Sequence, residues 1–318
     1  MEALLLNHLL PVSVSVLNPA SPEGSAILRL WNVSIWVCGL VLAIVTTSIG
    51  YIIVRFRKRD DAEPRQITGN TKLEIAWTVG PVLLVTLLFV LSIMTARAVD
   101  HPVRRDPDVV VIGHQWWWEV RYPAANVITA GEVHLPVGRK MLIAIESADV
   151  VHDFWAPRLS RKIDAIPGRR NFIWIEADSP EEYNGFCAEY CGPEHAWMLF
   201  RVMAEDESAY DAWLSAQSAA ASEHGSVEAQ RGRSRFGQLT CANCHNIRGV
   251  NQQNQYAPDL THMGSRKLLA SGRLTNTADH LREWLHEPNI VKPNCLMPNL
   301  HLSNDDLGAL TAYLESLQ

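Results

Sequence analysis

Two long apolar runs near the start of the chain limit what it can fold into. The first covers residues 30–54 and the second covers residues 75–96, and neither contains Asp, Glu, Lys or Arg. A helix needs about 20 predominantly apolar residues to cross a bilayer. Both runs exceed that length, and the segments that flank them are too short to surround two buried helices with soluble structure. We therefore expect a transmembrane hairpin within residues 26–100.

The charges beside these runs predict how the hairpin is oriented. The segment before the first run has Arg29 as its only basic residue, whereas the connection between the runs has six: Arg55, Arg57, Lys58, Arg59, Arg65 and Lys72. The positive-inside rule places such a connection in the cytoplasm. Everything after Arg97 then lies outside the cell. Residues 1–25 begin with Glu2 and show no clear cleavage site, which favours an outer tail over its alternative, a removed signal peptide.

The remaining length and charge allow further domains but give no sign of a nucleic-acid partner. A chain of 318 residues has room for two or three domains. Its formal net charge of −6 is mild, and no basic patch interleaved with aromatic residues follows the hairpin. Nucleic-acid binding therefore has no support.

Residues 101–205 have the short, alternating pattern of a β domain. Runs such as "VVVIG", "MLIAI", "FIWIEA" and "MLFRVM" are rich in β-branched and aromatic residues, and Pro, Gly and Asp separate them. Such a pattern is typical of strands joined by turns. We predict an antiparallel β-sandwich or barrel, a scaffold that can hold a metal on its loops.

The stretch "FCAEYCGPEHAWM", residues 186–198, concentrates metal-binding side chains in this domain. Cys187, Cys191, His195 and Met198 fall within it. A zinc site would use the thiols and the imidazole but not the thioether, whereas copper accepts all three. A disulfide is the plain alternative for the cysteines. A mononuclear blue-copper site needs one cysteine, so two predict a pair of copper ions bridged by thiolates, with an electron-transfer role.

Each copper ion also needs an imidazole, and His195 supplies one of the two. His152 in "VVHDFWAP" stands near the end of a predicted strand and is the favoured second ligand. His114 and His134 are rivals, although they lack the same turn context. We interpret both as structural histidines.

The C-terminal part carries a haem-attachment signature. Residues 206–228 are small and polar and predict a flexible linker with some helical tendency, ahead of a helical domain over residues 229–318. In "CANCH" the thiols of Cys241 and Cys244 would bind haem c covalently, with His245 as the proximal iron ligand.

The second axial ligand of this haem is predicted from the last loop. Met297 precedes a proline, and a capped amphipathic helix starts after Ser303. Met263 and His262 are rivals that lie earlier in the chain. A thioether ligand favours reduced iron, as an electron carrier requires. Cys295 has no assigned role beyond that of a small buried hydrophobe.

Four separated motifs resemble cytochrome c oxidase subunit II over residues 26–205: "GHQWWWEVRYP", "VHDFWAP", "RKIDAIPGRRN" and "CAEYCGPEHAWM". The resemblance implies a cupredoxin-like fold for residues 101–205. It also implies that His152 and Met198 complete one copper while His195 and the carbonyl of Glu189 complete the other. The side chain of Glu189 would help to hold magnesium at the junction with subunit I. The C-terminal domain is similar to small cytochromes c.

The same resemblance suggests roles for two other residues. An electron-entry tryptophan corresponds to Trp116, although the triplet of tryptophans at residues 116–118 could simply anchor the domain at the membrane surface. Glu74 corresponds to a glutamate at the cytoplasmic mouth of a proton pathway. Its plain interpretation is a carboxylate stabilised by a helix dipole.

Together these features predict the electron-entry subunit of a bacterial cytochrome c oxidase in the inner membrane, with its copper and haem domains on the periplasmic side. Electrons from an outside cytochrome or respiratory complex would pass to haem c, to copper and then to subunit I, where oxygen is reduced with proton pumping; subunit III is a further expected partner. Alternatives are the equivalent subunit of a nitric oxide reductase and a copper-delivery or redox-sensing protein. Related quinol oxidases lack these copper ligands.

Overall fold

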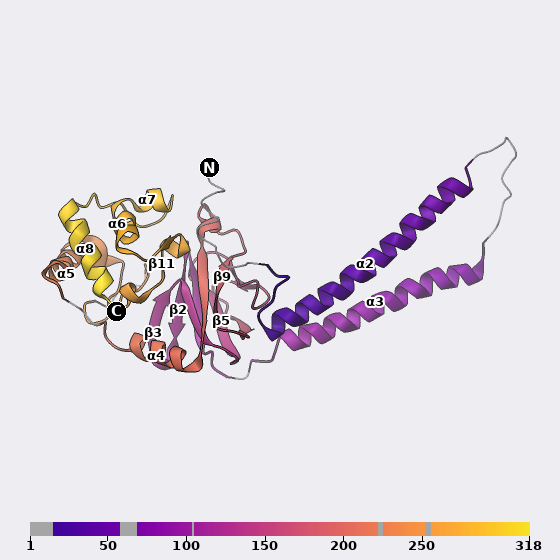
Figure 1. Ribbon diagram of the computed structural model, residues 1–318, viewed down its shortest axis with the longest axis horizontal. Helices are drawn as coiled ribbons and strands as arrows, with labels where there is room; N and C mark the ends of the chain where they lie inside the picture. Colours follow the sequence, from indigo (N-terminus) through magenta and orange to yellow (C-terminus); the bar gives the residue numbers. More distant parts are fainter. Residues whose placement is uncertain (1–14, 58–68, 104, 222–224, 252–255) are drawn as a thin grey trace. The chain divides into compact units, whose positions relative to one another are not determined.

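The computed structural model describes residues 15–57, 69–103, 105–221, 225–251 and 256–318 (Figure 1). They form two compact units, one of residues 25–101 and the other of the residues up to Gly24 together with residues 102–318. The expected tail of residues 1–25 lies largely outside the described residues, as do Lys58, Arg59 and Arg65 of the basic connection.

The first unit confirms the two predicted membrane helices. They are α2 (Pro22–Arg55) and α3 (Thr71–Val99), and their apolar side chains are exposed, as lipid contact requires. The Asn70 side chain caps α3 by accepting from the backbone N–H groups of Lys72 and Leu73. The hydroxyls of Thr78, Thr86 and Ser92 each donate to the carbonyl four residues earlier. These three hydroxyls are thus satisfied inside the helix.

The second unit contains the expected β-sandwich. One sheet has the order β3 (Val127–Ala130), β2 (Trp117–Tyr122), β1 (Val109–His114), β5 (Met141–Ser147) and β8 (Asn171–Ile175). The other has the order β4 (Glu132–Pro136), β10 (Leu199–Glu205), β9 (Glu181–Cys187), β6 (His152–Trp155) and β7 (Ile163–Ala165).

The sheets are mixed, whereas the sequence predicted antiparallel pairing. Strands β1 and β5 are parallel, and so are β4 and β10, while the other neighbours are antiparallel. The reason is the path of the chain, which leaves the first sheet after β3 to form β4 and then returns to place β5 beside β1. Pairing between sequence-distant strands depends on such crossovers and not on local pattern.

Aromatic side chains fill the space between the sheets. Trp118, Phe154 and Phe200 are fully buried and contact one another, with Phe154 and Phe200 stacked at 4.2 Å between ring centroids. Gly185 leaves room for this stack, because a Cβ there would lie 2.2 Å from the Phe200 ring. The core therefore fixes the strands from which the ligand loop emerges.

The segment expected to be a flexible linker is ordered over its first half. Residues Glu207–Ser218 form helix α4, which packs against β3, β4 and the short turn η1 (Pro123–Ala125). Tyr210, Trp213 and Leu214 have the spacing of one helix face and pack on the sandwich core. Trp213 stacks on His134 with ring centroids 3.8 Å apart. Because this apolar face packs on the sandwich, the first half of the predicted linker is a docked helix.

The C-terminal part of the second unit is helical, as expected. Its helices are α5 (Val227–Gln238), α6 (Ala278–His286), α7 (Pro288–Val291) and α8 (Asn304–Ser316), labelled in Figure 1. Its shorter elements are η3 (Thr240–Asn243), η4 (Met263–Ser265), β11 (Leu268–Leu269), η5 (Ala270–Gly272) and β12 (Leu274–Thr275).

Helices α5 and α8 cross at very close range. A Cβ on Gly232 would lie 2.0 Å from the carbonyl oxygen of Ala309, so only glycine fits at this crossing. The predicted cap of α8 is confirmed, because the Ser303 hydroxyl accepts from the backbone N–H of Asp306. Arg235 and Asp306 pair through two hydrogen bonds and link the two helices.

Candidate copper centre and haem site

The predicted copper ligands converge at one end of the sandwich. Strand β6 supplies His152, and the last residue of β9 is Cys187. The connection from β9 to β10, which contains η2 (His195–Trp197), supplies the others. The Sγ atoms of Cys187 and Cys191 lie 3.8 Å apart. His195 Nδ1 is 3.7 Å and Met198 Sδ is 3.8 Å from the Cys191 sulfur. His152 Nδ1 is 3.9 Å from the Cys187 sulfur.

A hydrogen bond on the far side of the imidazole orients His152. Its Nε2 lies 2.8 Å from Asp149 Oδ1, which leaves Nδ1 facing the cysteines. Carboxylates commonly fix the ring of a metal-binding histidine in this way. Asp149 also accepts from the backbone N–H of Gln115 at 2.6 Å. Sequence reasoning missed Asp149, although an acidic residue three positions before a candidate ligand is a visible signal.

The chemistry of the cluster fits copper. Cys187 and Cys191 are free thiols and are almost fully buried, as are His152 and Met198. The hydrogen bond from the Cys191 thiol stabilises the Cys187 thiolate and lowers the pKa of Cys187. The same contact raises the pKa of Cys191, because that thiol keeps its proton to donate it to the neighbouring thiolate. A bound metal would remove that proton, since thiolates are the metal-binding form. Two thiols, two imidazoles and a thioether form a soft donor set suited to copper.

The two rival histidines are occupied by carboxylates. His114 Nε2 lies 3.1 Å from Glu119 Oε2, and its ring stacks on Trp117. His134 lies 3.0 Å from Glu205 through Nδ1 and 3.6 Å from Glu132 through Nε2. Both rings therefore have the structural role that the sequence predicted.

The backbone carbonyl of Glu189 lies beside the cysteines, whereas the residue as a whole is exposed. Its carbonyl oxygen lies 3.2 Å from the Cys187 sulfur, while its residue surface is exposed. The carbonyl is thus placed to join the copper ligands while the carboxylate is free to face another partner. The presence of two copper ions, and the ion that each terminal ligand would serve, stay predictions.

The three consecutive tryptophans have separate environments. The indole N–H of Trp116 donates to the Cys191 carbonyl at 2.9 Å, which places this ring against the ligand loop. Trp117 packs on His114, and Trp118 is in the core. This division differs from a shared membrane belt, and electron entry through Trp116 stays a prediction.

The haem-attachment segment borders an apolar cavity. Its lining includes Cys241, His245 and Met297 together with Phe236, Leu260, Met263, Leu281, Trp284, Leu285, Pro298, Leu300, Leu302, Leu310 and Leu314. The His245 Nδ1 lies 2.8 Å from the Pro258 carbonyl, so the ring is held with its Nε2 free for iron. Burial lowers the pKa of His245, which favours the neutral, ligating form.

Two methionines line the same cavity. Met263 is buried, and its sulfur lies 3.9 Å from the guanidinium of Arg266. Met297 is partly buried and belongs to the loop before α8. The imidazole of the other rival, His262, is held by the Ala219 carbonyl at 3.2 Å. These contacts agree with Met297 as the distal ligand, which stays a prediction.

Cys295 and Glu74 have simple surroundings. The Cys295 sulfur lies 3.6 Å from the Met297 carbonyl, so this half-buried thiol supports the loop that carries the predicted ligand. Glu74 lies in the first turn of α3, where a negative charge favours the helix dipole.

The fold and the two donor sets define a membrane-anchored electron-transfer protein with a copper site and a c-type haem site. Three family models match the chain: "Cytochrome C oxidase subunit II, transmembrane domain" over residues 10–95, "Cytochrome C oxidase subunit II, periplasmic domain" over residues 126–204, and "Cytochrome c" over residues 229–318. The chain belongs to the cytochrome c oxidase subunit II family, in the form with a C-terminal cytochrome c domain.

Curated relatives extend this match over nearly the whole chain. Cytochrome c oxidase subunit 2 of Alkalihalophilus pseudofirmus is 36% identical and covers 96% of this chain and 91% of its own length. The subunit of Bacillus sp. (strain PS3) is 33% identical over 83% of this chain and 80% of its own. The crystal structure of the periplasmic domain of subunit II of cytochrome oxidase from Bradyrhizobium japonicum is 27% identical and covers 36% of this chain and 95% of that chain, with a TM-score of 0.35.

These matches establish the function of the chain as one subunit of a larger complex. The chain is the electron-entry subunit of an oxidase complex, a membrane protein with a periplasmic domain, and its domains imply copper and haem c. The nitric oxide reductase alternative gains no support from them.

Proposed function

We propose that the chain receives electrons from an outside donor at its C-terminal haem and passes them through a dinuclear copper centre to the haems of subunit I. When bound, haem c and copper supply reversible one-electron redox chemistry. The observation that carries the proposal is that His152, Cys187 and Cys191 converge and that the haem-attachment segment borders an apolar cavity, both within one compact unit that includes residues 102–318. The corresponding domains are residues 101–205 for copper and 229–318 for haem.

The protein contributes fixed geometry to this relay. Cys187 and Cys191 would bridge two copper ions, with His152 and Met198 completing one and His195 and the Glu189 carbonyl completing the other. Burial of both cysteines, His152 and Met198 excludes water from these ligands, and Asp149 prevents rotation of His152. A rigid donor set keeps the rearrangement that accompanies electron transfer small.

The haem segment is prepared in a similar way. Cys241 and Cys244 would anchor the haem, with His245 and Met297 as its axial ligands. The apolar walls of the cavity would shield the macrocycle from water, and the Pro258 carbonyl fixes the His245 ring. Trp116, hydrogen-bonded to the Cys191 carbonyl, is the proposed entry residue to the copper site.

The remaining assignments concern the assembled complex. Subunit I would contact the copper end of the sandwich, where the exposed Glu189 carboxylate could join a magnesium site at the junction. Subunit III completes the proposed membrane assembly. The hairpin would lie in the bacterial inner membrane, with Glu74 near the cytoplasmic side as a proton-entry residue.

Spectroscopy of the purified complex tests the central proposal. Visible spectra should show covalently bound haem c, and electron paramagnetic resonance should show a mixed-valence copper pair. A Cys187→Ser or Cys191→Ser variant should lose the copper signal and turnover yet retain haem c, and His152→Ala should weaken the copper signal likewise. Normal copper spectra in either cysteine variant would refute the bridging assignment.

The final acceptor and the proton pathway need separate assays. The purified complex should consume oxygen and not nitric oxide, and tightly held copper that resists chelators would argue against a delivery role. Glu74→Gln should slow turnover coupled to proton uptake. Unchanged turnover in that variant would remove Glu74 from the pathway.

A further inference from the structure

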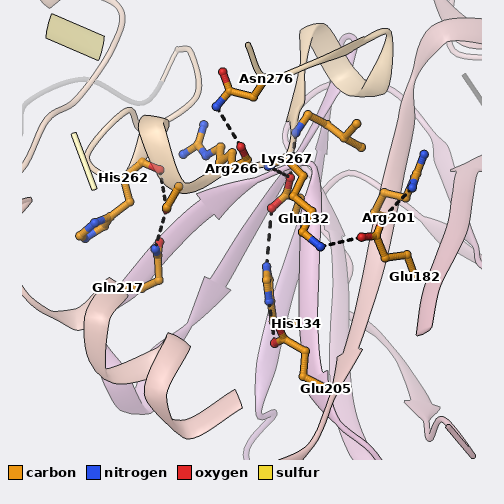
Figure 2. Close-up of polar contacts among 12 residues, drawn as sticks. Glu132, His134, Glu182, Arg201, Glu205, Gln217, His262, Arg266, Lys267 and Asn276 are labelled. Atoms are coloured by element: carbon orange, nitrogen blue, oxygen red, sulfur yellow. Dashed lines mark hydrogen bonds and ion pairs between the residues drawn. The ribbon is translucent and has the colours of Figure 1, made fainter. Parts of the chain in front are cut away.

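The haem-bearing part of the chain contacts the copper domain in several places. They include a hydrogen bond from Arg248 to the Asn126 carbonyl at 2.7 Å, an outer zone and an inner zone. The outer zone, shown in Figure 2, centres on Glu132, whose carboxylate accepts from the backbone N–H groups of Lys267 and Leu268 at 2.7 and 3.0 Å. The Lys267 ammonium also pairs with Glu182 at 2.6 Å. Because the Lys267 side chain is 58% exposed, this ion pair adds little to the free energy of docking.

The inner zone lies at Trp116 and is formed by the buried Lys292 and the half-buried Ser271. The ammonium of Lys292 and the hydroxyl of Ser271 both donate to the main-chain carbonyl of Trp116. Lys292 also donates to Ser271 Oγ at 2.8 Å. Only 4% of the Lys292 surface is exposed, so its charge has left water and depends on these acceptors.

The backbone of the cytochrome part is shaped to reach this carbonyl. Ala270, Ser271 and Gly272 have φ values of +48°, +58° and +85°, a left-handed run that two of these residues adopt at a cost. Gly272 brings the chain so close that an added Cβ would lie 3.0 Å from the Cβ of Leu199. Strained backbone of this kind persists where surrounding contacts determine it.

The inner zone also connects the two candidate sites. Lys292 lies five residues before Met297, in the loop that carries the predicted distal haem ligand. On the copper side, Trp116 donates to the carbonyl of Cys191. Arg273 lies 3.8 Å above the ring of Trp197, the neighbour of Met198. The contact thus covers the surface of the copper domain that lies beside its ligand loop.

We propose that Lys292, Ser271 and Gly272 form a built-in dock that holds the cytochrome domain on Trp116 and closes this surface to any separate carrier protein. This inference rests on the proposed relay and specifies its partner: a soluble one-electron carrier donates to the cytochrome domain and not directly to the copper domain. Lys292 is a positioning residue in this arrangement, since it acts through Trp116.

Oxidative footprinting of the complete complex tests the dock without relying on turnover. Hydroxyl radicals modify exposed Trp and Leu side chains, and mass spectrometry locates the products on Trp197 and Leu199. Lys292→Met keeps the length of the side chain but removes its donors, and should raise labelling of both residues roughly three- to ten-fold, as expected for a lost contact of ~0.7–1.4 kcal/mol. Ser271→Ala should raise the labelling of both residues by a smaller factor than Lys292→Met. It provides a second test of the dock in case Lys292→Met misfolds.

Lys267→Met is the matched control, because it removes a lysine from the outer zone but leaves the backbone hydrogen bonds to Glu132. Its labelling should remain close to that of the natural protein. Unchanged labelling in both Lys292→Met and Ser271→Ala, or an equal rise in Lys267→Met, would overturn the dock.

A rapid-mixing measurement tests the consequence for the donor. A reduced soluble c-type cytochrome is mixed with the complex, and the optical bands of haem c and copper are followed together. The natural protein should show copper reduction only after haem reduction, whereas Lys292→Met should gain an early phase at copper. An early copper phase in the natural protein would contradict the dock. Absence of either band before mixing would instead contradict the proposed relay.

Discussion

The copper and haem sites differ in how much of the surrounding fold depends on the group they would hold. The copper donors meet at the end of a sandwich whose core, with Trp118, Phe154 and Phe200, is already filled. The haem cavity lies among the side chains that form the core of the cytochrome domain, including Phe236 and Leu310. We infer that copper completes a site on a finished scaffold, whereas haem completes the scaffold itself.

The largest expected effect follows directly from this comparison. A Cys241→Ser, Cys244→Ser double variant should lose haem and with it most of the cytochrome domain's stability, because the apolar side chains that line the cavity would lose their packing against the macrocycle, a loss that we expect to cost about 3–5 kcal/mol or more. Limited proteolysis should then cut within residues 256–318. Cys187→Ser should lose copper but leave the sandwich resistant. Equal protease resistance of the cytochrome domain with and without haem would refute the comparison.

A single methyl group at the α5–α8 crossing should have the next largest effect. Gly232→Ala places a Cβ 2.0 Å from a backbone oxygen that cannot move alone, so we expect a loss of about 2–4 kcal/mol in the unfolding free energy of the cytochrome domain. Gly237→Ala is the matched control in the same helix. Its added Cβ meets nothing within 4 Å and should stabilise α5 by ~0.5 kcal/mol. Calorimetry of the two variants measures the difference between their unfolding free energies. Similar melting temperatures would contradict the close approach of α5 and α8 at Gly232.

The two methionines of the haem cavity offer a more local test. Met297→Ala should leave haem attached through Cys241 and Cys244 but change its axial ligation and lower its reduction potential, since a thioether favours reduced iron. Met263→Ala should keep both the spectrum and the potential near their original values. Spectroelectrochemical titration distinguishes them, and the reverse outcome would make Met263 the ligand.

The smallest effect concerns pH and the copper domain. Burial opposes the charged form of His134, but the hydrogen bonds to Glu132 and Glu205 outweigh it and raise its pKa above the usual 6.5. A raised folded-state pKa stabilises the fold below 6.5, and this contribution is lost as pH rises through the folded value. Thermal unfolding from pH 6 to 9 should therefore show a decline that His134→Gln flattens. A parallel decline in both proteins would exclude His134 as its cause.

Much of the two sites was predictable because their key residues are close in sequence. The stretch from Cys187 to Met198 and the "CANCH" segment carry most of the proposed ligands within short loops. His152 required a further argument from strand and turn context. Lys292 gave no local signal, because its role depends on a loop of one domain reaching a carbonyl of another.

The fold was predictable to a similar extent. The uncharged runs identified both membrane helices, and strand composition identified the sandwich. The parallel pairing of β4 with β10 depends on a crossover between sheets, which no local pattern records. The docked α4 was missed because its apolar face, at Tyr210, Trp213 and Leu214, is interrupted by small polar residues that resemble a linker.

Helix α4 also determines how a copper-binding fragment should be produced. A recombinant domain that stops after Glu205 would leave Tyr122 and His134 without Trp213, whose ring lies 5.1 Å and 3.8 Å from theirs. The exposed surface would be apolar and prone to association in concentrated samples. A fragment that continues to Ser218 carries its own cover, and is the better choice for crystallisation or isotope labelling.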